Sequence, residues 1–233
     1  METLPSIFDF LGGQSVAWEF PSQLDILLDY LGWSLSIMED LLEHNEHKVL
    51  KEYDEQEEPD VKQYLEEGVF IAEHLFPNLL RRSFFLTIYS LLEDSLRKRC
   101  LCVEREKAPP VLLEDIAGSG YIDQYRKYLE KLGGIDVQGI SEWKNFSLYA
   151  QLRNLIAHNQ GFLNPKNINL MRFIEGNSYL DTFYSDTDGE PEIIFRKGFC
   201  EEVLAAIKRF FQALDAQLPA ECQNLEQHFG YRP

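Results

Sequence analysis

The sequence is poor in cysteine and in uninterrupted apolar runs. Its 233 residues contain four cysteines, Cys100, Cys102, Cys200 and Cys222, which are too few and too scattered for a disulfide scaffold. Cys100 and Cys102 also lack the second pair that a zinc site would need. We therefore expect four reduced thiols in a cytoplasmic protein. No stretch of about 18 residues is free of charge, which predicts no membrane-spanning helix. The N-terminal METLPSIFDFLGG lacks the positive start of a secretory signal, so none is expected.

Basic residues are also scarce, with 22 Lys and Arg against 39 Asp and Glu, and the net charge of −17 taken alone argues against a nucleic-acid partner. The charge is uneven, however. Residues 1–80 hold 18 acidic and 3 basic side chains, whereas residues 81–233 hold 21 and 19. Within 81–107, seven basic residues stand against four acidic ones. An acidic front therefore precedes a near-neutral body with a basic cluster, and it is either a docking surface for a partner or a solvated surface without one.

Apolar residues make up 45% of the chain and aromatic residues 13%, which is enough for a packed core. Apolar side chains recur at helical spacing over 22–50, 61–75, 81–100, 120–134, 141–158 and 199–218, and these ranges are predicted to be helices. Residues 51–60 are charged and end in Pro-Asp, as a linker would, and Pro77 is expected to break the second helix.

The period changes after residue 165. The segments 168–176, 178–185 and 191–198 are short, rich in β-branched and aromatic residues, and separated by turn residues such as Asp188-Gly189. The sequence therefore predicts a mainly α fold, a helical bundle with a β-hairpin or three-stranded insertion at about 168–198 before the C-terminal helix. Its parts would be an acidic helical extension (1–60), the main helical domain (61–218) and a tail (219–233).

The predicted helix 141–158 is apolar on most sides but carries three polar residues near its end. Asn154 and His158 are four residues apart and so lie on one face. Arg153 points about 140° away from His158 on an ideal helix. Either its long side chain wraps toward the helix end, or the two groups meet across a two-fold axis between two copies of the chain. The plainer alternatives are a histidine that caps the helix and an arginine that extends to solvent.

The segment Arg153–Asn159, R-N-L-I-A-H-N, resembles the signature of the HEPN superfamily of ribonucleases. Members carry an arginine, a polar residue and then a histidine, with a short gap that is four residues here. The resemblance covers roughly 81–215 and implies a small helical bundle that dimerises and brings two motifs together. An upstream helix in many members adds an acidic residue, and the similar segment 89–100 offers Glu93 first and Asp94 next. The alternative for Glu93 is a salt bridge to Arg97.

The resemblance implies a metal-independent endoribonuclease, a member of the kind found in abortive infection and antiviral defence, that cleaves RNA by attack of the 2′-OH. No cofactor and no metal is implied. The residues assigned to catalysis are Arg153, His158 and Asn154; those assigned to support are Glu93, Asp94 and Asn159; those assigned to the RNA backbone are Arg97, Lys98 and Arg99.

The expected partners are RNA, a second copy of the chain, and a regulatory protein at the acidic N-terminal helices, with no membrane. Two alternatives remain open. The chain could be a non-catalytic HEPN-like interaction subunit of a defence or stress complex, or an unrelated helical adaptor whose acidic front binds a basic protein.

Overall fold

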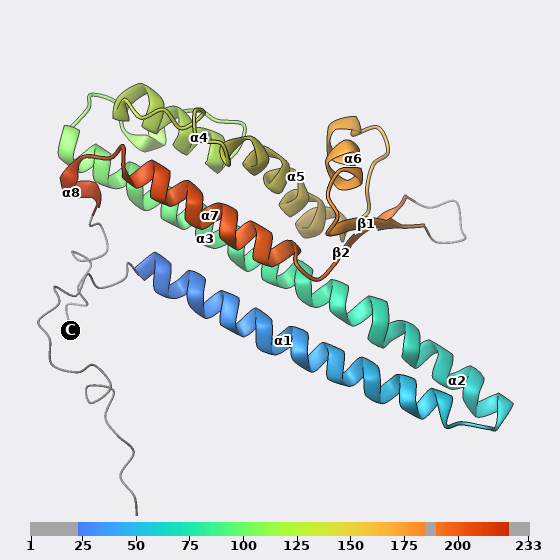
Figure 1. The fold of residues 1–233 in the computed structure, drawn as a ribbon. Coiled ribbons are helices and arrows are strands. Elements are labelled where there is room, and N and C mark those ends of the chain that lie inside the picture. The colour runs from blue at the N-terminus through green and yellow to red at the C-terminus, as the bar shows by residue number, and fades with distance from the viewer. Residues whose placement is uncertain (1–22, 185–189, 224–233) are drawn as a thin grey trace, which may run out of the picture.

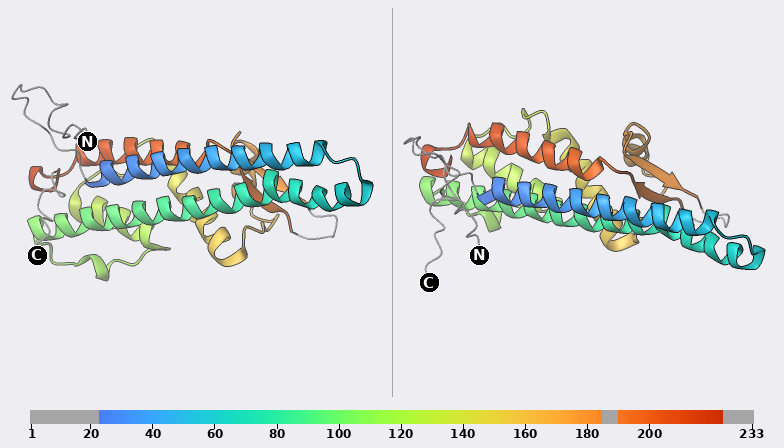
Figure 2. Two further views of the ribbon diagram at one scale, coloured as in Figure 1. Left: turned by 90° about the horizontal axis from the view of Figure 1, so that it is seen from below. Right: turned by 60° about the horizontal axis from the view of Figure 1, so that its bottom comes forward.

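The computed structural model describes residues 23–184 and 190–223, and two long antiparallel helical segments dominate it (Figure 1). The first is α1 (Gln23–Asp54). The second is a continuous rod made of α2 (Pro59–Phe70), the π-helical turn η1 (Ile71–Leu75) and α3 (Phe76–Lys107). Figure 2 shows the two segments side by side from two further directions.

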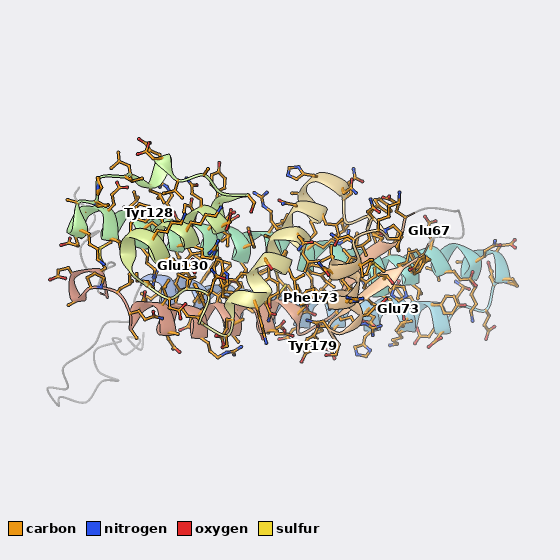
Figure 3. The ribbon with its side chains drawn as sticks, turned by 90° about the horizontal axis from the view of Figure 1, so that it is seen from above. Glu67, Glu73, Tyr128, Glu130, Phe173 and Tyr179 are labelled. Atoms are coloured by element: carbon orange, nitrogen blue, oxygen red, sulfur yellow. A yellow bond between two sulfur atoms is a disulfide. The ribbon has the colours of Figure 1, made fainter. Side chains whose placement is uncertain are left out.

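The remaining elements pack along α3. They are η2 (Leu113–Asp115), α4 (Tyr121–Tyr128), η3 (Leu129–Gly133), α5 (Trp143–Asn159), α6 (Ile168–Glu175), β1 (Leu180–Phe183), β2 (Glu192–Phe195), α7 (Phe199–Asp215) and α8 (Ala220–Gln223). Figure 3 shows Tyr128 and Glu130, from α4 and η3, in one half of the molecule, and Phe173, Tyr179 and Glu73, near the hairpin β1–β2, in the other. The predicted fold class, mainly α with a small β insertion before the last long helix, is confirmed.

The strand predicted over 168–176 is wrong, because Ile168–Glu175 form helix α6. The side chain of Asn167 accepts a hydrogen bond from the Leu170 N–H and so caps the helix start. Leu170 and Ile174, four residues apart, are the buried residues of α6, which is helical spacing. The hairpin instead gains a short third segment from Phe162, which bridges Glu192 in antiparallel fashion. The Asp188-Gly189 turn lies outside the described residues.

The predicted break at Pro77 is also wrong, because the helix runs through it. Proline has no N–H and its ring clashes with the carbonyl four residues earlier in a regular α-helix. The five residues of η1 widen the helix just before Pro77, and the Phe76 N–H bonds to the Ile71 carbonyl. The π-helical turn therefore lets the rod pass through the proline.

The core is centred on α3. Phe85, Ile88, Leu92 and Leu96 are fully buried, as the apolar spacing predicts. The Phe85 ring lies 5.4 Å from that of Phe195 and 6.2 Å from that of Tyr149, measured between centroids. Leu28 and Leu35 of α1 are buried in the same core, so the acidic first helix packs directly on the body.

The prediction of four reduced thiols is wrong at two positions. Cys102 of α3 and Cys222 of α8 form a disulfide, with Cα atoms 5.8 Å apart and 120 residues between them in sequence. This pairing could not be predicted from the cysteine spacing, because the path of α7 brings the two residues together. Cys100 and Cys200 remain free and buried. Burial raises the pKa of both thiols, so they stay protonated and unreactive.

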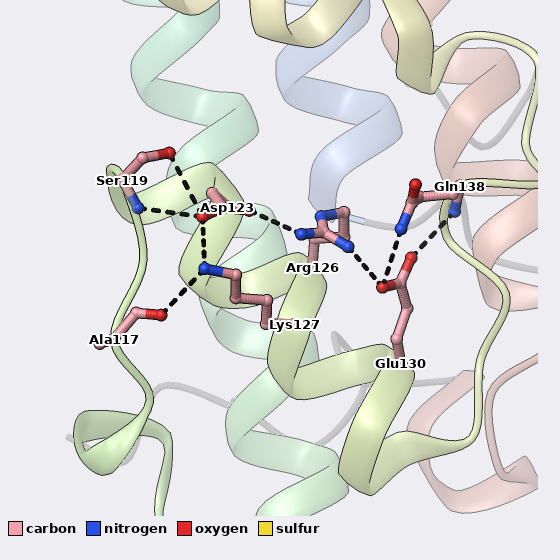
Figure 4. A network of polar contacts seen from close by, with 7 residues as sticks. All are labelled: Ala117, Ser119, Asp123, Arg126, Lys127, Glu130 and Gln138. Carbon is pink, nitrogen blue, oxygen red and sulfur yellow. Dashed lines mark hydrogen bonds and ion pairs between the residues drawn. The ribbon is translucent and has the colours of Figure 1, made fainter.

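An ion-pair network fixes α4 to the loop before it and to the segment after η3 (Figure 4). The Asp123 carboxylate pairs with Arg126 at 2.7 Å and Lys127 at 2.9 Å. It also accepts the Ser119 N–H. Burial opposes ionisation of Asp123, but the hydrogen bonds from Lys127, Arg126 and Ser119 outweigh it and hold the pKa of the carboxyl below its usual range.

We expect Asp123→Asn to lower the free energy of unfolding by about 1–2 kcal/mol at neutral pH. The folded-state pKa lies below the unfolded value of about 3.9, so the carboxylate stabilises the fold above that pH and the contribution disappears as the pH falls. The stability of the variant should therefore fall less than that of the wild type as the pH drops below about 4. Denaturant unfolding across pH measures this, with Glu57→Gln, an exposed carboxylate without a partner among the described residues, as the control. An unchanged pH slope in the Asp123 variant would contradict the assignment.

Candidate functional site

The candidate site lies at the C-terminal end of α5. This helix packs on α3, where the Tyr149 ring meets that of Phe85, and on α7, where the Phe146 ring lies 4.7 Å from that of Phe210. It ends at Asn159, and Gln160 follows in the left-handed conformation with φ 53°. His158 therefore sits in the last turn, where the unpaired carbonyls favour positive charge.

Arg153 and Asn154 are in contact, and His158 is open to solvent. An Nη atom of the half-buried Arg153 donates to the Asn154 Oδ1 at 3.0 Å. The His158 side chain is exposed and forms no hydrogen bond or ion pair within the described residues. The helix thus carries the Arg153 guanidinium, which is hydrogen-bonded to Asn154, and five residues later the exposed His158 imidazole. Within one chain these two groups do not contact each other.

Glu93 of α3 lies within electrostatic reach of Arg153. Burial raises the pKa of Glu93, and the Arg153 charge acts in the opposite direction. Both charges also act on Tyr89, one turn earlier on α3: burial and the Glu93 charge raise the pKa of the phenol, and Arg153 lowers it. The sequence analysis did not predict a role for Tyr89. Its position four residues before Glu93, which places both on one helix face, was the available signal. The alternative salt bridge between Glu93 and Arg97 does not form in the described structure.

The other two supporting residues have local roles. Asp94 pairs with Lys98 on the surface of α3 at 2.8 Å, an i,i+4 pair of the kind that contributes a few tenths of a kcal/mol. Asn159 donates from Nδ2 to the Phe162 carbonyl at 3.0 Å and so shapes the turn that follows α5. Neither contact is directed at Arg153.

Most of the basic cluster is paired with other groups of the same chain. Arg99 is buried, pairs with Asp215 of α7 through two hydrogen bonds of 2.6 Å, and stacks on the Phe211 ring at 4.1 Å. Of the other members, those with a partner are Arg81, Arg82, Lys98, Arg105 and Lys107. Arg97 alone is exposed without a carboxylate partner among the described residues.

Arg82 and Gly161 hold the segment after His158. Arg82 is buried, donates to the Gln160 carbonyl at 3.0 Å and to the Ile193 carbonyl, and pairs with Glu192 at 2.7 Å. Burial lowers the pKa of Arg82 and the Glu192 charge counteracts this. Gly161 has φ 91°, and a Cβ there would lie 2.6 Å from the Arg82 guanidinium. The end of α5 is therefore fixed to β2 by the Arg82 side chain, in addition to the backbone hydrogen bond from the Ile193 N–H to the Gly161 carbonyl.

The described residues hold no group of three or more His, Cys, Asp or Glu side chains that could bind a metal ion. Within 23–184 and 190–223, no helix has the length and apolar character needed to cross a membrane. Comparisons of the chain with protein-family models, with curated proteins and with solved structures found no match.

Proposed function

We propose that the chain is a metal-independent endoribonuclease of the HEPN type, with a composite active site between two copies, that acts in bacterial defence or toxin-like RNA decay. The observation that carries the proposal is the state of two side chains on one helix end. Arg153 is held by Asn154 beside Glu93, whereas His158 is exposed and unpaired within the described structure. Cleavage of a phosphodiester needs a cation to balance the phosphate charge and a group that can take and give a proton, and this helix end carries one of each.

In the proposed reaction RNA supplies the nucleophile, its own 2′-OH. His158 takes the 2′ proton as the oxygen attacks phosphorus, and Arg153 pairs with the phosphate oxygens as negative charge grows on them. The protonated imidazole then donates this proton to the leaving 5′-oxygen, so each site needs one His158 and the partner subunit's Arg153. The products carry a 2′,3′-cyclic phosphate and a 5′-hydroxyl. Asn154, in contact with Arg153, orients the guanidinium.

The two-fold arrangement is proposed because the helix separates its two functional groups. Arg153 and His158 point about 140° apart on one helix, so within one chain their side chains face different sides of α5. Two α5 helices related by a two-fold axis would place Arg153 of each chain against His158 of the partner subunit.

A non-catalytic interaction subunit is the second candidate function, and the fate of the basic cluster favours it. Ribonucleases use exposed Lys and Arg to hold the RNA backbone, and six of the seven cations between residues 81 and 107 are already paired with other groups of the same chain, Lys98 and Arg105 at the surface. The net charge of −17 also repels RNA. This function requires no RNA cleavage.

An RNA substrate places the proposed activity in the cytoplasm. The Cys102–Cys222 disulfide is unusual for that reducing compartment and is the observation that argues most strongly against this location.

Mixing two inactive variants tests the composite site. Arg153→Ala and His158→Ala chains are purified separately, mixed, dissociated and reassembled. If each site uses Arg153 of one chain and His158 of the other, half of the dimers are mixed and each holds one intact site. Cleavage of a fluorescent RNA should then return to about a quarter of the wild-type rate.

Two outcomes would count against the proposal. An active wild type without rescue on mixing would place both groups of a site in one chain and overturn the composite arrangement. A wild type that leaves RNA intact at every protein concentration, while folded and dimeric, would leave the interaction subunit as the function. The wild-type reaction should also persist in EDTA.

A further inference from the structure

A large groove lies between α1, η1 and the hairpin β1–β2, in the half of the molecule away from α8. Its volume is about 1070 Å³, the size of a ligand or peptide site. Its lining includes Phe70 of α2, Leu75 of η1, Phe183 of β1 and Glu39 of α1. Figures 1 and 2 show the hairpin lying against this half of the rod. We refer to this space as the hairpin groove.

Buried polar contacts hold the walls of the hairpin groove in place. Arg81 of α3 pairs with Glu39 of α1 through two hydrogen bonds of 2.6 Å and also donates to the Phe195 carbonyl of β2 at 3.1 Å. The Asn78 side chain accepts the Phe195 N–H at 2.9 Å and donates to the Ile193 carbonyl at 3.2 Å. Two residues of α3 therefore fix both α1 and β2, and a ligand would meet a site that is already formed.

The mouth of the hairpin groove is apolar and exposed. The rings of Phe70 and Phe183 lie 6.1 Å apart and bridge the rod and the hairpin. Phe70 is 45% exposed, Phe183 44% and Leu75 39%. Large apolar side chains grouped around a groove, rather than scattered singly, mark an interaction site.

The lining of the hairpin groove is strongly acidic. Seven carboxylates line it against three Lys and Arg side chains, a net of −4 with neutral histidines. The three cations are already paired with lining carboxylates, and Glu192 is paired with Arg82. Three carboxylates are left over. Glu46 and Glu190 have no basic partner among the described residues, and Glu73 has only the exposed His74 imidazole at 3.8 Å.

We propose that the hairpin groove binds a basic amphipathic segment of a partner protein. Apolar side chains of that segment pack against Phe70 and Phe183, and its Lys or Arg side chains pair with Glu46, Glu73 and Glu190. Opposite charge steers such a segment to the groove, and the apolar contact holds it there. An RNA strand is disfavoured because its phosphates would face these carboxylates.

Peptide binding to the full chain tests the proposal without any RNA cleavage, so its result is independent of the ribonuclease activity. The probe is a fluorescein-labelled peptide with lysines on one helical face and leucine and phenylalanine on the other. A second peptide replaces the apolar residues by serine, and a third replaces the lysines by glutamate. Fluorescence anisotropy should show the first peptide binding at least about tenfold more tightly than either control.

Two variants locate the binding. Phe70→Ser with Phe183→Ser, and separately Glu46→Gln with Glu73→Gln and Glu190→Gln, should each weaken binding of the first peptide about tenfold or more. The matched control, Glu57→Gln with Glu58→Gln and Glu67→Gln, removes the same charge from exposed positions that do not line the groove and should leave the affinity unchanged. The substituted phenylalanines are partly exposed, so the variants should fold, which melting curves check.

Four results would overturn the proposal. The wild type binds none of the peptides, or it binds the serine peptide as tightly as the apolar one. The groove and control carboxylate variants weaken binding equally, which would show a general charge effect. An oligouridine RNA, rather than the peptide, loses affinity in the Phe70 and Phe183 variant, which would make the groove a nucleic-acid site.

Discussion

His158→Ala should reduce kcat/KM for RNA cleavage by about 10²–10⁴-fold, the range for losing a positioned acid–base group. The stability of the fold should stay unchanged, because the His158 side chain is exposed and has no hydrogen-bond partner in the described part of the chain. Cleavage of a fluorescent RNA by purified protein gives the rate, and denaturant unfolding gives the stability. In bacteria that overproduce the two proteins, RNA decay and growth arrest should follow only the wild type.

The control for this result is His44→Ala, which removes an exposed imidazole from α1. It should cleave RNA at the wild-type rate. Cleavage by the His158 variant within a few-fold of wild type would remove this histidine from the chemistry. An equal loss in both variants would point to a general effect on folding or to a contaminating nuclease.

Gly161→Ala should lower the free energy of unfolding by about 3–5 kcal/mol. An alanine at φ 91° is strained, by about 1–2 kcal/mol for a left-handed residue. Its Cβ would also lie 2.6 Å from the Arg82 guanidinium, which has no room to retreat because it is buried and bonded to Gln160, Ile193 and Glu192. Displacing Arg82 would leave buried polar groups unpaired, which is the larger part of the effect.

Urea unfolding measures the effect, and Gly120→Ala is the matched control. A Cβ at Gly120 meets nothing within 4 Å, so that variant should differ little from wild type. A double-mutant cycle then isolates the contact: with Arg82→Met already present, Gly161→Ala should cost less than in the wild type. Additive effects of the two substitutions would show that the strain at Gly161 is local and does not act through Arg82.

Most of the correct predictions follow from the spacing of apolar residues along single helices. The buried residues of α3, Phe85, Ile88, Leu92 and Leu96, follow from the period of the apolar residues. The approximate end of α5 follows from Gly161, which comes just after it. Residues 168–176 were assigned the wrong type because isoleucine and phenylalanine favour strands when read alone. The cap from Asn167 and the burial of Leu170 and Ile174 overrode that preference.

The candidate site was predicted in part, for the same reason. Arg153, Asn154 and His158 belong to one helix, and their relative directions follow from the helical repeat alone. The pairing of the basic residues 81–107 could not be predicted from local spacing. Arg81 meets Glu39, which is 42 residues away in sequence, and Arg99 meets Asp215, which is 116 residues away. Only the packing of α1 and α7 on α3 shows that Arg81 and Arg99 are paired within the fold.

The bond between Cys102 and Cys222 turns half of the polypeptide into a closed ring. A protease that cuts one peptide bond anywhere inside this ring cannot release a fragment, because both new ends stay attached through the two sulfurs. After a single cut inside the ring, the two pieces separate only if the disulfide is also reduced. One such cut therefore leaves the chain joined in an oxidising environment and divides it in a reducing one.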